Sequence, residues 1–220
     1  WLKRRSSSAH VLSLSFYSGV GPGTHGSGTR RRPRCTGEEV PSGSVLLNRE
    51  IAVKCSAEEV IMIAQFRMHE FDQVHFVTAA HRIAKFGGLA AHQGSTVLRV
   101  IECLTMMIPN MCARHLANSV WAFARLAVGD APLMHAISSA ARVSIANFRP
   151  PELASTAWSL ASLRFRNEPL LYAISPAARL RVAEFDPRGI SGTLWAMSQL
   201  LFVDSPLLDA LSAAALNHRS

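Results

Sequence analysis

A tryptophan-containing segment occurs three times in the 220-residue chain, and its spacing constrains the fold more than any other feature. Successive members of the series Trp121, Trp158 and Trp195 are 37 residues apart. An alignment of residues 113–149 with residues 150–186 gives 15 identical positions out of 37. A fixed interval of this size is typical of stacked repeat proteins, in which each repeat is one supersecondary unit. The spacing therefore predicts an array of repeats.

Each repeat has the pattern of a helical hairpin. In residues 150–186, apolar residues recur at helical spacing in two segments. Pro150 and Pro151 begin the first segment and Pro169 begins the second, and proline is favoured in the first turn of a helix. One such hairpin cannot bury its apolar face alone, so neighbouring hairpins must stack. We expect an all-α fold, an α-solenoid of stacked helical hairpins with a period of 37 residues.

The upstream half contains a diverged copy of the same pattern. Residues 71–86 align with residues 111–126 at an offset of 40, and His81 occupies the tryptophan position. A second helix is expected at about residues 95–108. Further upstream, SAEE (Ser56 to Glu59) has the pattern of a capping box at a helix start. We expect residues 44–220 to form about four hairpins, the last of which is truncated near Ser220.

The N-terminal segment has a different composition. Residues 1–37 contain seven Lys and Arg side chains and no acidic residue, so they account for +7 of the net charge of +8. We expect residues 1–43 to be a disordered tail rich in Arg, Ser and Gly. Two interpretations stay open, an organelle transit peptide and a solvated linker. Residues 113–189, with nine Arg and five acidic residues, carry a smaller local excess of positive charge.

The sequence contains no recognisable catalytic or cofactor motif. The nine His residues show no H-E-x-x-H spacing, the four Cys residues form no C-x-x-C pair, and no G-x-S-x-G or Walker sequence occurs. No apolar run reaches the ~18 residues that a membrane-spanning helix needs. We therefore expect a non-catalytic chain without a cofactor, metal, small-molecule substrate or membrane partner.

Three segments carry a resemblance to a known class of repeat proteins: LANSVWAFARL (116–126), FRPPELASTAWSLASL (148–163) and FDPRGISGTLWAMSQL (185–200). They resemble the octotricopeptide and heptatricopeptide repeat proteins, which are related to the FAST-kinase-like organellar proteins and often carry a RAP domain. This resemblance implies binding of single-stranded RNA in a mitochondrion or plastid. It further implies a role in RNA processing, RNA stability or translation, alongside other organellar proteins that act in these steps.

Small polar residues at three positions of each first helix are the predicted base-facing set. They vary from repeat to repeat, as a modular RNA reader requires, although a solvated helix face would have the same composition. The three tryptophans are expected in the core. The predicted RNA-binding residues are Lys85, Asn118, Ser119, Arg125, Ser155, Thr156, Ser162, Thr193 and Gln199. The predicted phosphate contacts are Arg142, Arg179 and Arg181.

Two functions follow from this reading. The first is a non-catalytic binder of single-stranded organellar RNA, and the motivation is the resemblance together with the variable polar positions. The second is an α-solenoid scaffold for protein–protein interaction, because residues 38–220 are nearly neutral and solenoids also bind peptides.

Overall fold

The computed structural model describes residues 42–91 and 94–217, in which all regular secondary structure is helical. These residues form ten α-helices and four short 3₁₀ helices, and no strand occurs among them. The all-α prediction is therefore confirmed for this part of the chain. The tail predicted for residues 1–43 lies outside the described residues, except that Ser42 and Gly43 belong to the first helix. No helix in the described part is both long enough and apolar enough to cross a bilayer.

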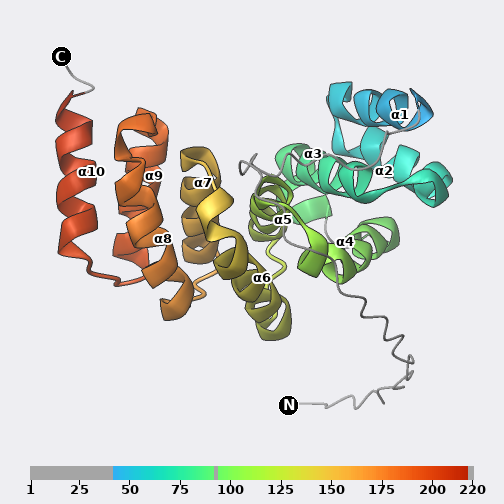
Figure 1. Cartoon of the computed structure of the whole chain (residues 1–220). Helices are drawn as coiled ribbons and strands as arrows, with labels where there is room; N and C mark the ends of the chain where they lie inside the picture. Colours follow the sequence, from blue (N-terminus) through green and yellow to red (C-terminus); the bar gives the residue numbers. More distant parts are fainter. Residues whose placement is uncertain (1–41, 92–93, 218–220) are drawn as a thin grey trace, which may run out of the picture. The chain divides into compact units, whose positions relative to one another are not determined.

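The ten α-helices pack in a row in chain order (Figure 1). Helices α3, α5, α7 and α9 pack successively on one another and form one layer, while α6, α8 and α10 form a second. The α-helices are α1 Ser42–Val53, α2 Ala57–Arg67, α3 Gln73–Ala91, α4 Ser95–Met107, α5 Ala113–Arg125, α6 Ala131–Ser144, α7 Pro150–Ser162, α8 Glu168–Leu180, α9 Pro187–Gln199 and α10 Ser205–Asn217. The 3₁₀ helices are η1 Met68–Glu70, η2 Ile108–Asn110, η3 Ile145–Asn147 and η4 Val182–Glu184.

Most helix starts in the C-terminal half are fixed by a polar side chain just before the helix. The side-chain oxygens of Asp130, Asn167 and Asp186 accept hydrogen bonds from backbone N–H groups three residues later, at 2.8, 3.0 and 2.6 Å. Such caps pair N–H groups that lack an intrahelical partner. Helix α2 begins directly after Ser56, which accepts from the N–H of Glu59 at 3.2 Å, so the predicted start of this helix is confirmed.

The C-terminal ends of α5, α7 and α9 share one turn. The residue two positions after each of these helices has a positive φ, with values of 54° at Ala127, 53° at Arg164 and 50° at Leu201. The next residue donates its N–H back across the turn; for example, Val128 donates to the carbonyl of Phe123 at 2.9 Å. This is the Schellman arrangement, which pairs the last carbonyl groups of a helix.

The apolar core lies between the two layers. Phe148 and Phe185, which directly precede the capping residues of α7 and α9, are among the largest fully buried side chains. Met111 occupies the corresponding place before α5 and is also buried. One large apolar side chain before each of α5, α7 and α9 is therefore buried in the core.

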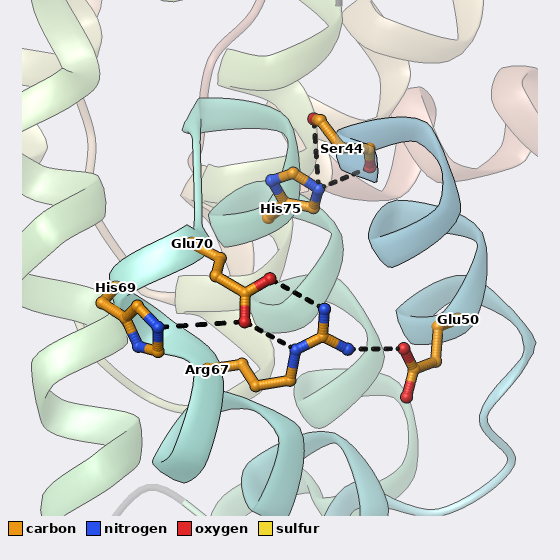
Figure 2. Close-up of polar contacts among 6 residues, drawn as sticks. All are labelled: Ser44, Glu50, Arg67, His69, Glu70 and His75. Atoms are coloured by element: carbon orange, nitrogen blue, oxygen red, sulfur yellow. Dashed lines mark hydrogen bonds and ion pairs between the residues drawn. The ribbon is translucent and has the colours of Figure 1, made fainter. Parts of the chain in front are cut away.

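Helix α1 is held by polar contacts (Figure 2). The guanidinium of Arg67 donates to the carboxylates of Glu50 on α1 and Glu70 on η1, at 2.9 and 2.8 Å. The imidazole of His75 is fully buried, and its Nε2 lies 2.8 Å from the backbone oxygen of Ser44. Because a carbonyl oxygen only accepts, Nε2 is the donor in this contact, while Nδ1 lies 3.0 Å from the backbone nitrogen of Asp72 and 2.8 Å from its carboxylate. His75 thus connects the start of α1 to the start of α3.

Candidate functional site

Three of the predicted RNA-binding residues are buried, and the prediction is wrong for them. Ser119, Thr156 and Thr193 have exposed fractions of 0, 1 and 1%. The hydroxyl of Ser119 lies 3.6 Å from the sulfur of Met111, and Thr193 donates to the carbonyl of Gly189 at 2.8 Å. These side chains pack inside the helix layer and are not available to a ligand.

The cause is that the buried side of each odd-numbered helix is rotated about the helix axis, so that it includes a position predicted to face RNA bases. Each odd-numbered helix packs on an odd-numbered neighbour as well as on the second layer, so the buried side of α5 includes Ser119, Ala122 and Phe123. The tryptophan position then falls at the edge of the buried side. Trp121 and Trp158 are half-buried, and Trp195 is 43% exposed, so the prediction that the tryptophans lie in the core is wrong for Trp195.

The remaining predicted residues separate into two groups. Lys85, Arg125 and Ser155 line one common groove, of which Lys85 and Arg125 are exposed and Ser155 is half-buried. The structure does not place the other residues in this groove. Asn118 is half-buried, and Ser162 and Gln199 are exposed.

The predicted phosphate contacts lie elsewhere in the fold. Arg142 and Arg179 are exposed on α6 and α8, in the second layer. The Arg181 guanidinium donates to the backbone oxygens of Phe148 at 2.7 Å and Ala146 at 3.1 Å. This guanidinium therefore connects the end of α8 to the chain near η3.

The groove has a volume of about 820 Å³ and runs across one side of the layer of odd-numbered helices. Residues of α3, α5, α7 and α9 line it, together with the capping residue of α9. The lining residues are Lys85, Trp121, Arg125, Pro151, Ala154, Ser155, Trp158, Asp186, Arg188, Gly189, Ser191, Gly192 and Trp195. The indoles of Trp121, Trp158 and Trp195 therefore contribute to one concave surface.

The shape of the groove follows from large and small residues on neighbouring turns. Ala154, Ser155, Gly189 and Gly192 are small residues that lie between the tryptophans on α7 and α9. A Cβ atom added at Gly192 would meet no atom within 4 Å. Trp195, three residues later on the same helix, is 43% exposed.

The three tryptophan rings of the groove take part in two aromatic pairs. The ring centroids of Trp158 and Trp195 are 6.3 Å apart, and the ring planes are inclined by 30°. His81 and Trp121 are closer, with centroids 4.6 Å apart and planes inclined by 31°. The guanidinium carbon of Arg125 lies 6.0 Å from the Trp121 ring centroid, within the range of a cation–π contact.

The charged groups give the groove a positive balance. Lys85, Arg125 and Arg188 face a single carboxylate among the lining residues, Asp186. One oxygen of that carboxylate already accepts from the N–H of Gly189 at 2.6 Å. Burial, with the nearby charges of Lys85 and Arg82, holds the pKa of His81 below its usual value of 6.5. The imidazole beside Trp121 is therefore uncharged at neutral pH.

The exposed face of Trp195 is the part of this groove that was not expected from the sequence, because the tryptophans were predicted to lie in the core. Arg188 follows Pro187 in the first turn of α9, outside the helix positions that were predicted to face RNA bases. Ser155 and Gly192, which lie three positions before Trp158 and Trp195, also line the groove. No group of three His, Cys, Asp or Glu residues in the described part is placed to hold a metal ion.

Comparisons of the chain with models of known protein families and with curated proteins found no match. The candidate site therefore rests on the geometry and charge of the groove.

Proposed function

We propose that this chain binds single-stranded RNA in the groove across α3, α5, α7 and α9. The observation that carries the proposal is that Trp121, Trp158 and Trp195 share one concave surface with three cationic side chains. Proteins that bind single strands combine aromatic side chains, on which bases stack, with cations that follow the phosphate backbone. The groove has both parts within a single surface.

The expected energies fit a binder of moderate affinity. Stacking of a base on an aromatic side chain contributes ~1–3 kcal/mol per base by alanine substitution. If Lys85, Arg125 and Arg188 each neutralise one phosphate, log K falls with log salt with a slope of about −2, since each phosphate contributes ~−0.7 for a single strand.

We further propose that the repeats form an α-solenoid with a 37-residue unit, of the octotricopeptide or heptatricopeptide kind. Helices α5, α7 and α9 begin at Ala113, Pro150 and Pro187, which are 37 residues apart, and this spacing supports the proposal. The shared turn after each of these helices supports it as well. The resemblance at repeat level and the basic N-terminal composition favour a mitochondrion or plastid. The proposed role is non-catalytic, in RNA processing, stability or translation, with other organellar proteins as partners.

The test compares two charge-matched variants of the full chain. Fluorescence anisotropy of a labelled 12-nucleotide RNA, r(A)₁₂, measures binding over a series of salt concentrations. The double variant Arg125→Ala/Arg188→Ala removes two groove cations, and we expect a loss of affinity of ~3- to 30-fold. The control Arg142→Ala/Arg179→Ala removes the same charge from the second layer, and its affinity should stay within ~2-fold of the unmodified chain.

Equal losses in the two double variants would show that RNA follows net charge and does not occupy the groove. No salt-sensitive binding at micromolar protein would overturn the proposal. Capture of a protein partner that ribonuclease does not affect, together with absent RNA binding, would favour the scaffold function.

A further inference from the structure

Another groove lies between α6 and α8, in the second layer. These two helices pack on each other (Figure 1). The groove has a volume of about 560 Å³, and its lining residues are Ser139, Arg142, Val143, Pro169, Tyr172 and Ala173. None of these residues lines the groove across α3, α5, α7 and α9. This surface is therefore separate from the proposed RNA site.

Two large side chains of this groove are open to a ligand. Val143 is 89% exposed, and Tyr172 is 63% exposed. The Tyr172 ring nevertheless has a fixed support, because it packs edge-on against the buried ring of Phe202, with centroids 5.0 Å apart and planes inclined by 75°. A ring that is exposed but already held in place loses little conformational entropy when a ligand covers it. Tyrosine is also a residue type that often dominates the energetics of protein interfaces.

Arg142 provides the charge of this groove. Its side chain is exposed, and the lining includes no acidic residue. Two other arginines of this region are occupied, since Arg166 forms an ion pair with Glu168 at 2.8 Å and Arg181 donates to the backbone oxygen of Phe148 at 2.7 Å. Arg142 has no such partner among the described residues. Its planar guanidinium can therefore bind a carboxylate of a ligand through two parallel hydrogen bonds.

We propose that the groove between α6 and α8 binds an acidic segment of a partner protein, with a carboxylate on Arg142 and an apolar side chain between Val143 and Tyr172. The guanidinium disfavours a cationic segment, because the groove has no acid to receive it. A nucleic-acid strand needs several cations along its backbone, whereas this groove has one. The inference does not depend on RNA binding in the other groove.

The first experiment finds ligands without assuming their sequence. A display library of random dodecapeptides is selected on the immobilised full chain and, in parallel, on the double variant Arg142→Ala/Tyr172→Ala. We expect peptides that are enriched on the unmodified chain but not on the variant, with more Asp and Glu than Lys and Arg and with apolar residues between them. The absence of such variant-sensitive peptides, or an excess of basic residues in them, would overturn the proposal.

The second experiment measures the affinity of the most enriched peptide by fluorescence anisotropy. Arg142→Ala should weaken binding by ~3- to 30-fold, and replacing the peptide carboxylates by amides should weaken it by a similar factor. Tyr172→Ala should weaken binding by ~5- to 30-fold, whereas Tyr172→Phe keeps the ring and should retain most of the affinity. Arg125→Ala is the matched control, because it removes the same charge from the RNA groove and should change peptide affinity by less than ~2-fold.

The outcomes separate this surface from the RNA groove. If Arg125→Ala weakens the peptide as much as Arg142→Ala does, the peptide follows net charge and the proposal is wrong. If Arg142→Ala/Tyr172→Ala weakens r(A)₁₂ as much as the peptide, RNA occupies this surface and the proposal is again wrong. If r(A)₁₂ does not bind but the peptide binds in an Arg142-dependent way, the proposed RNA function fails and the peptide surface is supported.

Discussion

The C-terminal helices α5–α10 and the N-terminal helices α1–α4 are built by different means. In the C-terminal part, similar devices recur: a capping side chain, a large buried residue before each odd-numbered helix, and a turn with a positive φ. In the N-terminal part, particular polar contacts hold α1, such as the hydrogen bonds of His75 and Arg67. Both parts have a buried apolar core, and in the N-terminal part these polar contacts add to the packing of α1.

His81 marks the boundary between these two parts. It occupies the tryptophan position of the diverged copy and lies against Trp121. One ring of the aromatic series is thereby used in an internal contact.

The largest expected difference between the two parts concerns the residue before each odd-numbered helix. Phe148 is 1% exposed, so Phe148→Ala should lower the free energy of unfolding by ~3–5 kcal/mol, through lost burial and a cavity. Phe71 has the same place before α3 but is half-buried, so Phe71→Ala should cost less. Urea unfolding followed by far-UV circular dichroism measures both. An equal or larger cost at Phe71 would contradict the comparison.

A smaller effect is expected from the imidazole that holds α1. His75→Ala removes the partner of the Ser44 carbonyl and of the Asp72 N–H, and we expect a loss of ~1–3 kcal/mol. Hydrogen exchange should show loss of protection concentrated in α1. The control His135→Ala removes an exposed imidazole from α6 and should change stability by at most ~0.5 kcal/mol. Unchanged protection of α1 in His75→Ala would show that apolar packing alone holds this helix.

Two glycines in the groove are expected to respond in opposite directions. Gly192→Ala should stabilise the protein by ~0.5–1 kcal/mol, because the added Cβ meets no atom within 4 Å and alanine is the better helix former. At Gly189 the added Cβ would lie 2.9 Å from the Asp186 carboxylate oxygen, so Gly189→Ala should destabilise. Thermal unfolding of both variants tests this. Stabilisation of both would mean that the floor of the groove adjusts freely.

The smallest expected effect is a change in the pH dependence of stability when His81, the residue beside Trp121, is replaced. Since the pKa of His81 is lowered in the folded chain, the unfolded chain binds a proton more readily. The stability that this group contributes is present above pH ~6.5 and is lost as the pH falls through the folded value. His81→Phe should therefore lose less stability between pH 7 and 5 than the unmodified chain.

Other groups do not confuse this measurement. The pKa of His115 is lowered as well, by burial and by Arg114, and its contribution is the same in both proteins. The stability that Asp72 contributes is lost only below its usual pKa of 3.8. Burial raises the pKa of its carboxyl, but hydrogen bonds from His75 and Ser44 lower this pKa by more, so that the net shift is downward. An identical slope in His81→Phe would show that His81 has no part in the pH dependence.

Local signals in the sequence were sufficient to predict several of the helices, but not α1. Proline at Pro150, Pro169 and Pro187 and the capping pattern after Ser56 are local signals, because proline geometry and a side-chain cap involve only a few neighbouring residues. The 37-residue spacing of the tryptophans indicated which segments are equivalent. Lys85, Arg125 and Ser155 lie along one groove, because equivalent positions of neighbouring helices lie on the same side.

Tertiary packing decided which side of each helix is buried. A helix with alanine and serine on most faces has a weak amphipathic pattern, which fixes the direction of its buried side only to within about one residue. The extra contact between successive odd-numbered helices rotated this buried side. For this reason Ser119, Thr156 and Thr193 are inside and Trp195 faces the groove. The sequence by itself determined which segments are similar to one another. The groove exists only because neighbouring helices pack at this rotation and leave small residues beside large ones.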